Sequence, residues 1–149
     1  MPQGTLEVLL VSAKGLENTD LLNNMDPYVI LICRTQEQKS SVASGKGTEP
    51  DWNENFVFTI SDGVSELTLK IMDSDAGTED DFVGEANIPL EPLFMEGSLF
   101  PTAYNVVKNE EFRGEIRVAL TFTPEVRGGQ DFPVEEESYG GWKESSYTE

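Results

Sequence analysis

The sequence predicts an all-β fold, an eight-stranded antiparallel β-sandwich. Three observations support this fold class. Apolar and polar residues alternate with a period of two in most segments before residue 124, which is typical of strands that bury one face. Turn-rich stretches such as Ser44–Gly47 and Ser61–Gly63 separate these segments. The one helical segment, Glu91–Glu96, spans a single turn with Pro92 near its start, so we expect a connector.

The expected strands follow one another along the chain. The first alternates over residues 5–10, and the second, Tyr28–Cys33, is a continuous apolar run that suits a central strand. The last, Glu115–Phe122, has the cleanest alternation. The other strands are expected at 39–43 (Lys39 to Ala43), 55–60, 66–72, 82–88 and 104–107. We interpret Cys33 as a packed thiol, and Trp52 and the phenylalanines as core residues.

Residues 1–123 are expected to form one domain, followed by a disordered acidic tail at 124–149. The tail has Gly-rich and acidic clusters and no hydrophobic periodicity, a composition that cannot build a packed core. It holds seven acidic and two basic residues, so −13 of the net charge of −18 belongs to the domain. The acidity is therefore a property of the folded part.

The composition excludes several classes of function. The chain has no histidine and one cysteine, which removes His-dependent catalysis, His- or Cys-rich metal sites and disulfides. A net charge of −18 disfavours nucleic acid, and no apolar run approaches the ~18 residues of a membrane span. The N-terminus resembles no signal peptide, so we expect a cytoplasmic protein. Exposed carboxylates without a nucleophile indicate binding, and no enzyme is expected.

Aspartate is concentrated in two predicted loops. Six of the nine Asp residues fall there, namely Asp20, Asp26, Asp73, Asp75, Asp80 and Asp81. Glutamate is the commoner acid in the chain, yet these loops contain only Glu17 and Glu79. Ca²⁺ takes about six to eight oxygen ligands, and short Asp side chains supply them with a smaller entropy loss than Glu. Asp73 and Asp75 extend a strand, so their two-residue spacing points both carboxylates to one face.

These aspartates have alternative explanations. Aspartate is common in turns because it bonds to nearby backbone, and for any single residue this explanation is as good as a metal ligand. For the whole set it is weaker, since uncompensated carboxylates at one end of a sandwich would repel one another. An EF-hand is excluded, because a loop starting at Asp73 has Thr78 and Gly84 where that motif needs Gly and Glu.

Three motifs resemble those of the C2 domain, the calcium- and phospholipid-binding sandwich of protein kinase C and synaptotagmin. They are residues 6–16 followed by Asp20 and Met25-Asp26-Pro27-Tyr28-Val29, then Pro50-Asp51-Trp52-Asn53-Glu54 with Phe56 and Phe58, and Met72-Asp73-Ser74-Asp75 with Asp81 and Gly84. The resemblance covers residues 4–123 and extends more narrowly to the small elicitor-responsive proteins of plants. It implies the type II (phospholipase-like) strand order, because the first acidic loop follows the first strand.

The resemblance also implies a Ca²⁺ site. The family's five calcium-binding aspartates match Asp20, Asp26, Asp73, Asp75 and Asp81, and Thr78 falls where some members place an extra oxygen ligand. Asp80 matches no ligand, so we expect it to contribute only to the electrostatic field. The lysine-rich strand of phosphoinositide-binding members is reduced here to Lys39 and Lys46, and calcium-independent lipid binding is not expected.

The leading functional hypothesis is a monomeric, calcium-dependent module that binds anionic phospholipid, recruited from the cytoplasm to the plasma membrane in calcium signalling or a defence response. Leu21, Leu22 and Met25 lie between the aspartates of the first loop and are expected to contact the membrane, unless one of them packs beneath the loop. The alternative function is a calcium-stabilised protein-interaction adaptor that does not bind lipid directly.

Overall fold

The computed structural model describes residues 3–18, 25–75 and 79–125. Within these ranges the chain forms eight strands and one short helix. They are β1 (Gly4–Lys14), β2 (Pro27–Cys33), β3 (Gln36–Lys39), β4 (Asp51–Ile60), β5 (Glu66–Asp73), β6 (Asp81–Pro89), α1 (Glu91–Glu96), β7 (Ser98–Lys108) and β8 (Glu111–Pro124). All paired strands are antiparallel, which confirms the predicted fold class.

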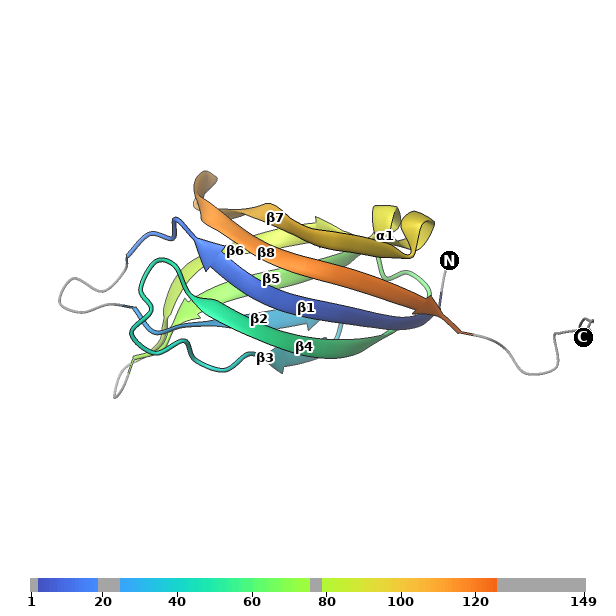
Figure 1. Cartoon of the computed structure of the whole chain (residues 1–149), viewed down its shortest axis with the longest axis horizontal. Helices are drawn as coiled ribbons and strands as arrows, with labels where there is room; N and C mark the ends of the chain where they lie inside the picture. Colours follow the sequence, from blue (N-terminus) through green and yellow to red (C-terminus); the bar gives the residue numbers. More distant parts are fainter. Residues whose placement is uncertain (1–2, 19–24, 76–78, 126–149) are drawn as a thin grey trace, which may run out of the picture.

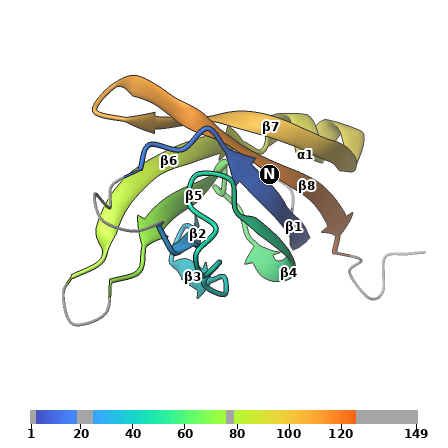
Figure 2. The same ribbon diagram turned by 60° about the vertical axis from the view of Figure 1, so that its left-hand side comes forward.

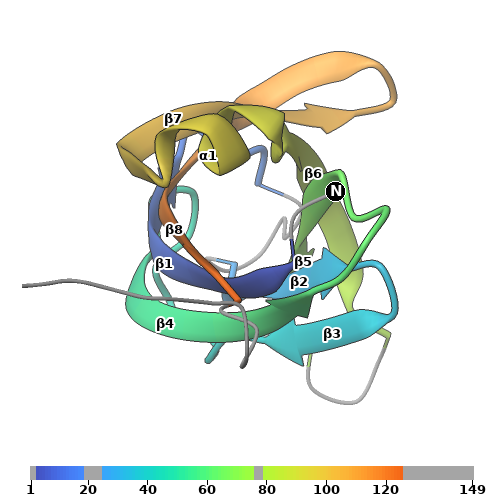
Figure 3. The same cartoon turned by 90° about the vertical axis from the view of Figure 1, so that its right-hand side faces the viewer.

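The strands form two facing layers. Their order in the sheet is β3-β2-β5-β6-β7-β8-β1-β4, and the sheet folds back on itself so that β4, β1, β8 and β7 face β3, β2, β5 and β6 (Figure 1, Figure 3). The layers are joined where β6 meets β7, through a ladder with the single pair Glu85 and Val107. Since β8 pairs with β1, the strand order is the type II order that the resemblance implies.

The two edge strands, β3 and β4, are linked by side chains. The Gln36 amide donates to the Thr59 carbonyl at 2.5 Å and accepts the Thr59 N–H at 2.9 Å. The Gln38 amide donates to the Val57 carbonyl at 2.6 Å. These bonds occupy backbone groups that an edge strand would otherwise expose, and they hold the sandwich closed on this side.

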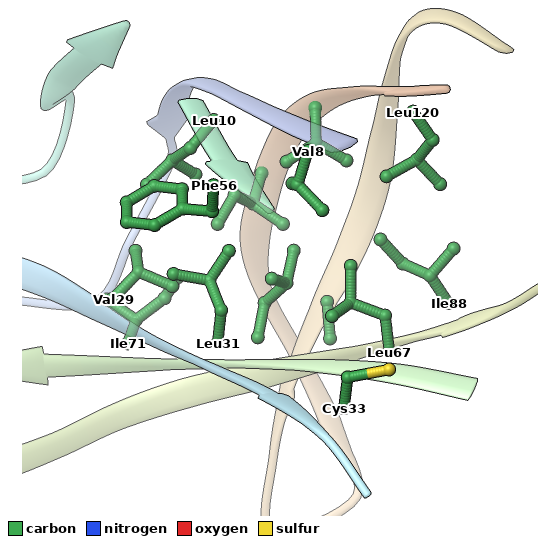
Figure 4. Close-up of a cluster of buried hydrophobic side chains, with 14 of the residues drawn as sticks. Val8, Leu10, Val29, Leu31, Cys33, Phe56, Leu67, Ile71, Ile88 and Leu120 are labelled. Atoms are coloured by element: carbon green, nitrogen blue, oxygen red, sulfur yellow. The ribbon is translucent and has the colours of Figure 1, made fainter. Parts of the chain in front are cut away.

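The core lies between the layers and includes the residues that the period-two pattern assigned to the inner strand faces, together with loop and helix residues such as Met25 and Leu93. Figure 4 shows side chains of both layers pointing toward one another, among them Val8, Leu10, Phe56 and Leu120 on one side and Val29, Leu31, Leu67, Ile71 and Ile88 on the other. Cys33 is buried with them, and burial raises the pKa of its thiol. The interpretation of Cys33 as a packed thiol is therefore confirmed.

The prediction of a strand at Lys39–Ala43 is wrong in its bounds, because β3 runs from Gln36 to Lys39. Arg34 has a φ of +55° and tightens the turn after β2, so pairing resumes earlier than expected. Beyond Lys39, the Ser40 N–H still donates to the Val29 carbonyl at 2.8 Å, but the Val29 N–H is accepted by the Ser40 hydroxyl, also at 2.8 Å, so the regular ladder ends here. β3 is entirely polar in sequence, so no alternation marks it.

The interpretation of the phenylalanines as core residues is wrong at two positions. Phe100 is 89% exposed and Phe112 is 72% exposed. Phe100 lies in a register shift of the β7–β8 ladder between Leu99 and Thr102, which turns it away from the core. Phe112 lies at the tip of the β7–β8 hairpin and precedes Ile116, which is the first buried residue of β8.

Helix α1 is the single-turn connector that the sequence predicts. It has Pro92 in its first turn, buries Leu93, and ends where the Gly97 N–H donates to the Leu93 carbonyl at 2.7 Å. Among the described ranges, no helix is long and apolar enough to cross a membrane.

Candidate metal centre

The acidic segments meet at one end of the sandwich. β2 pairs with β5 so that Pro27 lies opposite Asp73, and β5 pairs with β6 so that Asp73 lies opposite Asp81. Antiparallel pairing therefore brings the start of β2, the end of β5 and the start of β6 to the same edge (Figure 2). The connection between β3 and β4 also reaches this end, where Gly45 bonds to Asp26.

Three carboxylates form a cluster there. One oxygen from each of Asp73, Asp75 and Asp81 lies within 4.8 Å of the others. Asp73 is buried, with 1% of its surface exposed, whereas Asp75 is half-buried and Asp81 is exposed. The cluster thus has a buried floor and an open rim. Grouped carboxylate oxygens are the ligands that Ca²⁺ prefers, so the donor set fits this ion.

Asp26 ties the floor of the cluster to two neighbouring segments. Its backbone N–H donates to Asp73 Oδ1 at 2.9 Å, and its carbonyl accepts the Ser74 N–H at 3.0 Å. Its side-chain Oδ1 accepts the Gly45 N–H at 2.6 Å. Asp26 therefore lies beside the cluster. Its hydrogen bonds link the end of the β1–β2 connection to Gly45 in the β3–β4 connection and to Asp73 and Ser74 at the end of β5.

Asp80 and Tyr28 hold the described ends of the connection between β5 and β6, a role that the sequence reasoning missed. Asp80 Oδ1 accepts the Asp75 N–H at 3.0 Å, and Asp80 Oδ2 accepts the Tyr28 hydroxyl. Burial and the Asp80 carboxylate raise the pKa of Tyr28 to about 12, while the bonds from Tyr28 and from the Asp75 N–H lower the pKa of Asp80. Tyr28 stays neutral and Asp80 stays ionised at pH 7. The only signal in the sequence was the adjacent pair Asp80 and Asp81, and that pair does not indicate which of the two bonds to Tyr28.

The electrostatics of this end favour a cation. Carboxylates that share a site repel one another, and a bound divalent ion relieves that repulsion while it satisfies the oxygens. The hydrogen bonds that the Asp26 N–H donates to Asp73 and the Tyr28 hydroxyl donates to Asp80 stabilise these two carboxylates but leave their negative charges in place. The arrangement can therefore bind a hard divalent cation between the β1–β2 and β5–β6 connections.

The remaining predicted site residues have different outcomes. Asp20, Leu21, Leu22 and Thr78 lie outside the described residues. Met25 is described, and its expected membrane contact is wrong, because its side chain is fully buried in the core. The Met25 carbonyl also accepts the Gly47 N–H at 3.0 Å, which fixes this residue beneath the loop. The predicted tail from residue 124 likewise lies almost wholly outside the described ranges.

Comparisons with known proteins agree with this architecture. The sequence model of the C2 domain matches residues 4–106. The 16 kDa phloem protein 2 of Arabidopsis thaliana is 67% identical over 145 residues, which cover 97% of this chain and 97% of that protein. A solved C2 domain-containing protein from a putative elicitor-responsive gene is 67% identical with a TM-score of 0.75, covering 89% of this chain and 95% of the other.

A more distant solved structure holds two C2 domains of Extended-Synaptotagmin 2 in the calcium-bound state. It is 26% identical with a TM-score of 0.70, covering 82% of this chain and 46% of that one. The names of the phloem and elicitor-responsive relatives denote no enzyme. The family match spans most of the chain and the phloem protein aligns with nearly all of it, so the chain belongs to the C2 domain family.

Proposed function

We propose that this C2 domain binds Ca²⁺ at the cluster of Asp73, Asp75 and Asp81 and, once loaded, binds anionic phospholipid membranes. The observation that carries the proposal is the grouping of these three carboxylates within 4.8 Å, on a buried floor with an open rim. An ion held on one side by protein oxygens keeps positions for oxygens from another molecule. Lipid phosphate and carboxylate groups are oxygen donors of this kind.

The proposed mechanism is electrostatic. Without Ca²⁺, the acidic end of a chain with a net charge of −18 repels an anionic membrane surface. Two or three bound ions would add about +4 to +6, which roughly cancels the charge of the loop carboxylates. Asp20, Asp26 and Thr78 are proposed to complete the ligand set, and Leu21 and Leu22 to enter the membrane interface.

The biological setting of the proposal comes from the relatives. The structural relative from a putative elicitor-responsive gene supports a place in a defence response. Calcium signalling, with recruitment of the protein from the cytoplasm to the plasma membrane, is part of the same proposal. The calcium-bound state of the Extended-Synaptotagmin 2 domains supports Ca²⁺ as the ligand.

Calcium is expected to stabilise the fold. Ions that bind only the native protein add RT ln(1 + [L]/Kd) to the free energy of unfolding, about 2.7 kcal/mol at a hundredfold excess over Kd. The melting temperature should therefore rise in millimolar Ca²⁺ and much less in Mg²⁺, which demands a smaller and more rigid octahedral site. Differential scanning calorimetry measures this. Identical melting curves in EGTA and in Ca²⁺ would exclude the metal site.

Vesicle binding is expected to require both Ca²⁺ and anionic lipid. The matched measurement is co-sedimentation with phosphatidylserine-containing and pure phosphatidylcholine vesicles, each in Ca²⁺ and in EGTA. Pelleting should occur in one of the four conditions, phosphatidylserine with Ca²⁺, because the ion must offset repulsion between like charges. Strong binding to phosphatidylserine in EGTA would contradict the proposal. Calcium stabilisation without pelleting in any condition would favour the adaptor function instead.

A further inference from the structure

We propose that Tyr28 and Asp80 are positioning residues, which hold Asp75 and Asp81, at the two described ends of the β5–β6 connection, in the positions that receive the cation before any ion binds. This inference rests on the proposed calcium site. It differs from the expectation, drawn from the sequence, that Asp80 acts only through its charge.

The contacts of Asp80 define its role. One carboxylate oxygen accepts the Asp75 N–H at 3.0 Å, and the other accepts the Tyr28 hydroxyl. Both oxygens therefore have partners within the protein. Among the described residues, Asp80 is not part of the three-carboxylate cluster, although it is adjacent to Asp81 in the chain. These contacts fit a residue that orients ligands better than they fit a ligand.

The positions of the partners explain what the contacts achieve. Asp75 stands at the beginning of the β5–β6 connection and Asp80 at its end, so the bond between them closes the connection at its base. Tyr28 lies in β2, opposite Met72 of β5, and it anchors the closed connection to the neighbouring strand. The two hydrogen bonds thus fix the backbone at Asp75 and at Asp80, which precedes Asp81, relative to the buried Asp73.

Such anchoring is needed because the cluster is repulsive. Three carboxylates within 4.8 Å favour a separated arrangement when no cation is present. A freely moving connection would have to be ordered at the moment of binding, and the cost would appear as a weaker affinity. Contacts that order it beforehand remove that cost.

Replacing Tyr28 by phenylalanine separates a positioning role from a purely electrostatic effect of Asp80, because the substitution removes one hydroxyl and no charge. If Tyr28 positions Asp75 and Asp81, the Kd for Ca²⁺ measured by isothermal titration calorimetry on the full chain should rise about tenfold or more, the worth of one hydrogen bond to a charged group. The melting temperature in EGTA should also fall by a few degrees, because the lost hydrogen bond is present before any ion binds. Tyr104→Phe is the matched control, a half-buried tyrosine on β7 that should bind Ca²⁺ as the wild type does.

A second pair of variants separates position from charge on the other partner. Asp80→Asn and Glu79→Gln each remove one negative charge from neighbouring positions, but only the former loses an acceptor oxygen that bonds to Tyr28 or Asp75. A positioning role predicts that Asp80→Asn weakens Ca²⁺ binding several-fold more than Glu79→Gln does. Comparing Asp80→Asn with Glu79→Gln tests the positioning role even if Tyr28→Phe fails to fold.

The outcomes are distinct. Wild-type affinity in Tyr28→Phe, or equal losses in Asp80→Asn and Glu79→Gln, would overturn the positioning role and leave the proposed function intact. An absence of Ca²⁺ binding to the wild-type chain would overturn the proposed function and this inference together.

Discussion

Replacing Gly114 by alanine is expected to lower the free energy of unfolding by about 2 to 5 kcal/mol, a sum of backbone strain and overpacking. Gly114 has a φ of +103°, a conformation that residues with a side chain rarely adopt. A Cβ at this position would lie 2.6 Å from the Lys14 carbonyl oxygen and 2.7 Å from the carbonyl group of Gly15. These are backbone atoms, so the clash cannot be relieved by a rotamer change.

The Gly114 contact matters for the site because of where it lies. β1 ends at Lys14, and Gly15 starts the connection that carries the first predicted aspartates. Gly97→Ala is the matched control, since Gly97 has a φ of +86° and no atom within 4 Å of an added Cβ. It should cost only the strain of about 1 to 2 kcal/mol. Equal losses for the two variants in urea denaturation would show that the close approach to β1 is unimportant.

The fold was predictable because its core depends on alternation. Residues such as Leu6, Leu69 and Val118 are fully buried at the positions that the period-two pattern assigned to the inner faces. The single helical turn also followed from local chemistry, with Pro92 at its start and Gly97 at its end. Where an element depends on its partners, sequence reasoning failed. β3 is polar along its length and exists because β2 pairs with it, and β7 begins at Ser98, in a stretch without alternation.

The candidate site was predictable in part, for the same physical reason. The spacing of Asp73 and Asp75 predicts carboxylates on one face of a strand, and the structure brings oxygens of both together with one of Asp81. The role of Tyr28 could not be read from spacing, because its partner Asp80 lies 52 residues away in the sequence. Met25 was expected at the membrane because it lies between Asp20 and Asp26, whereas burial of its side chain depends on the packing of the layers below.

Changing Asp73 and Asp75 together to asparagine is expected to abolish Ca²⁺-dependent vesicle binding while the sandwich stays folded. Asparagine keeps the size of aspartate and removes the negative charge that holds the cation. It also keeps one side-chain oxygen, so the bond that Asp73 accepts from the Asp26 N–H at 2.9 Å can persist. In EGTA the melting temperature should be unchanged or slightly higher, because the substitutions relieve repulsion within the cluster.

The double variant should be more damaging than Asp80→Asn, since it removes two members of the cluster, whereas the single variant leaves all three in place. Matched calorimetric melts and co-sedimentation assays on the wild type, Asp73→Asn/Asp75→Asn and Asp80→Asn make the comparison. We expect no pelleting for the double variant at any Ca²⁺ concentration that saturates the wild type, and a shifted midpoint with full pelleting for Asp80→Asn. A wild-type midpoint in the double variant, or a larger loss in Asp80→Asn, would show that these carboxylates are not the ligands and that the ion binds elsewhere.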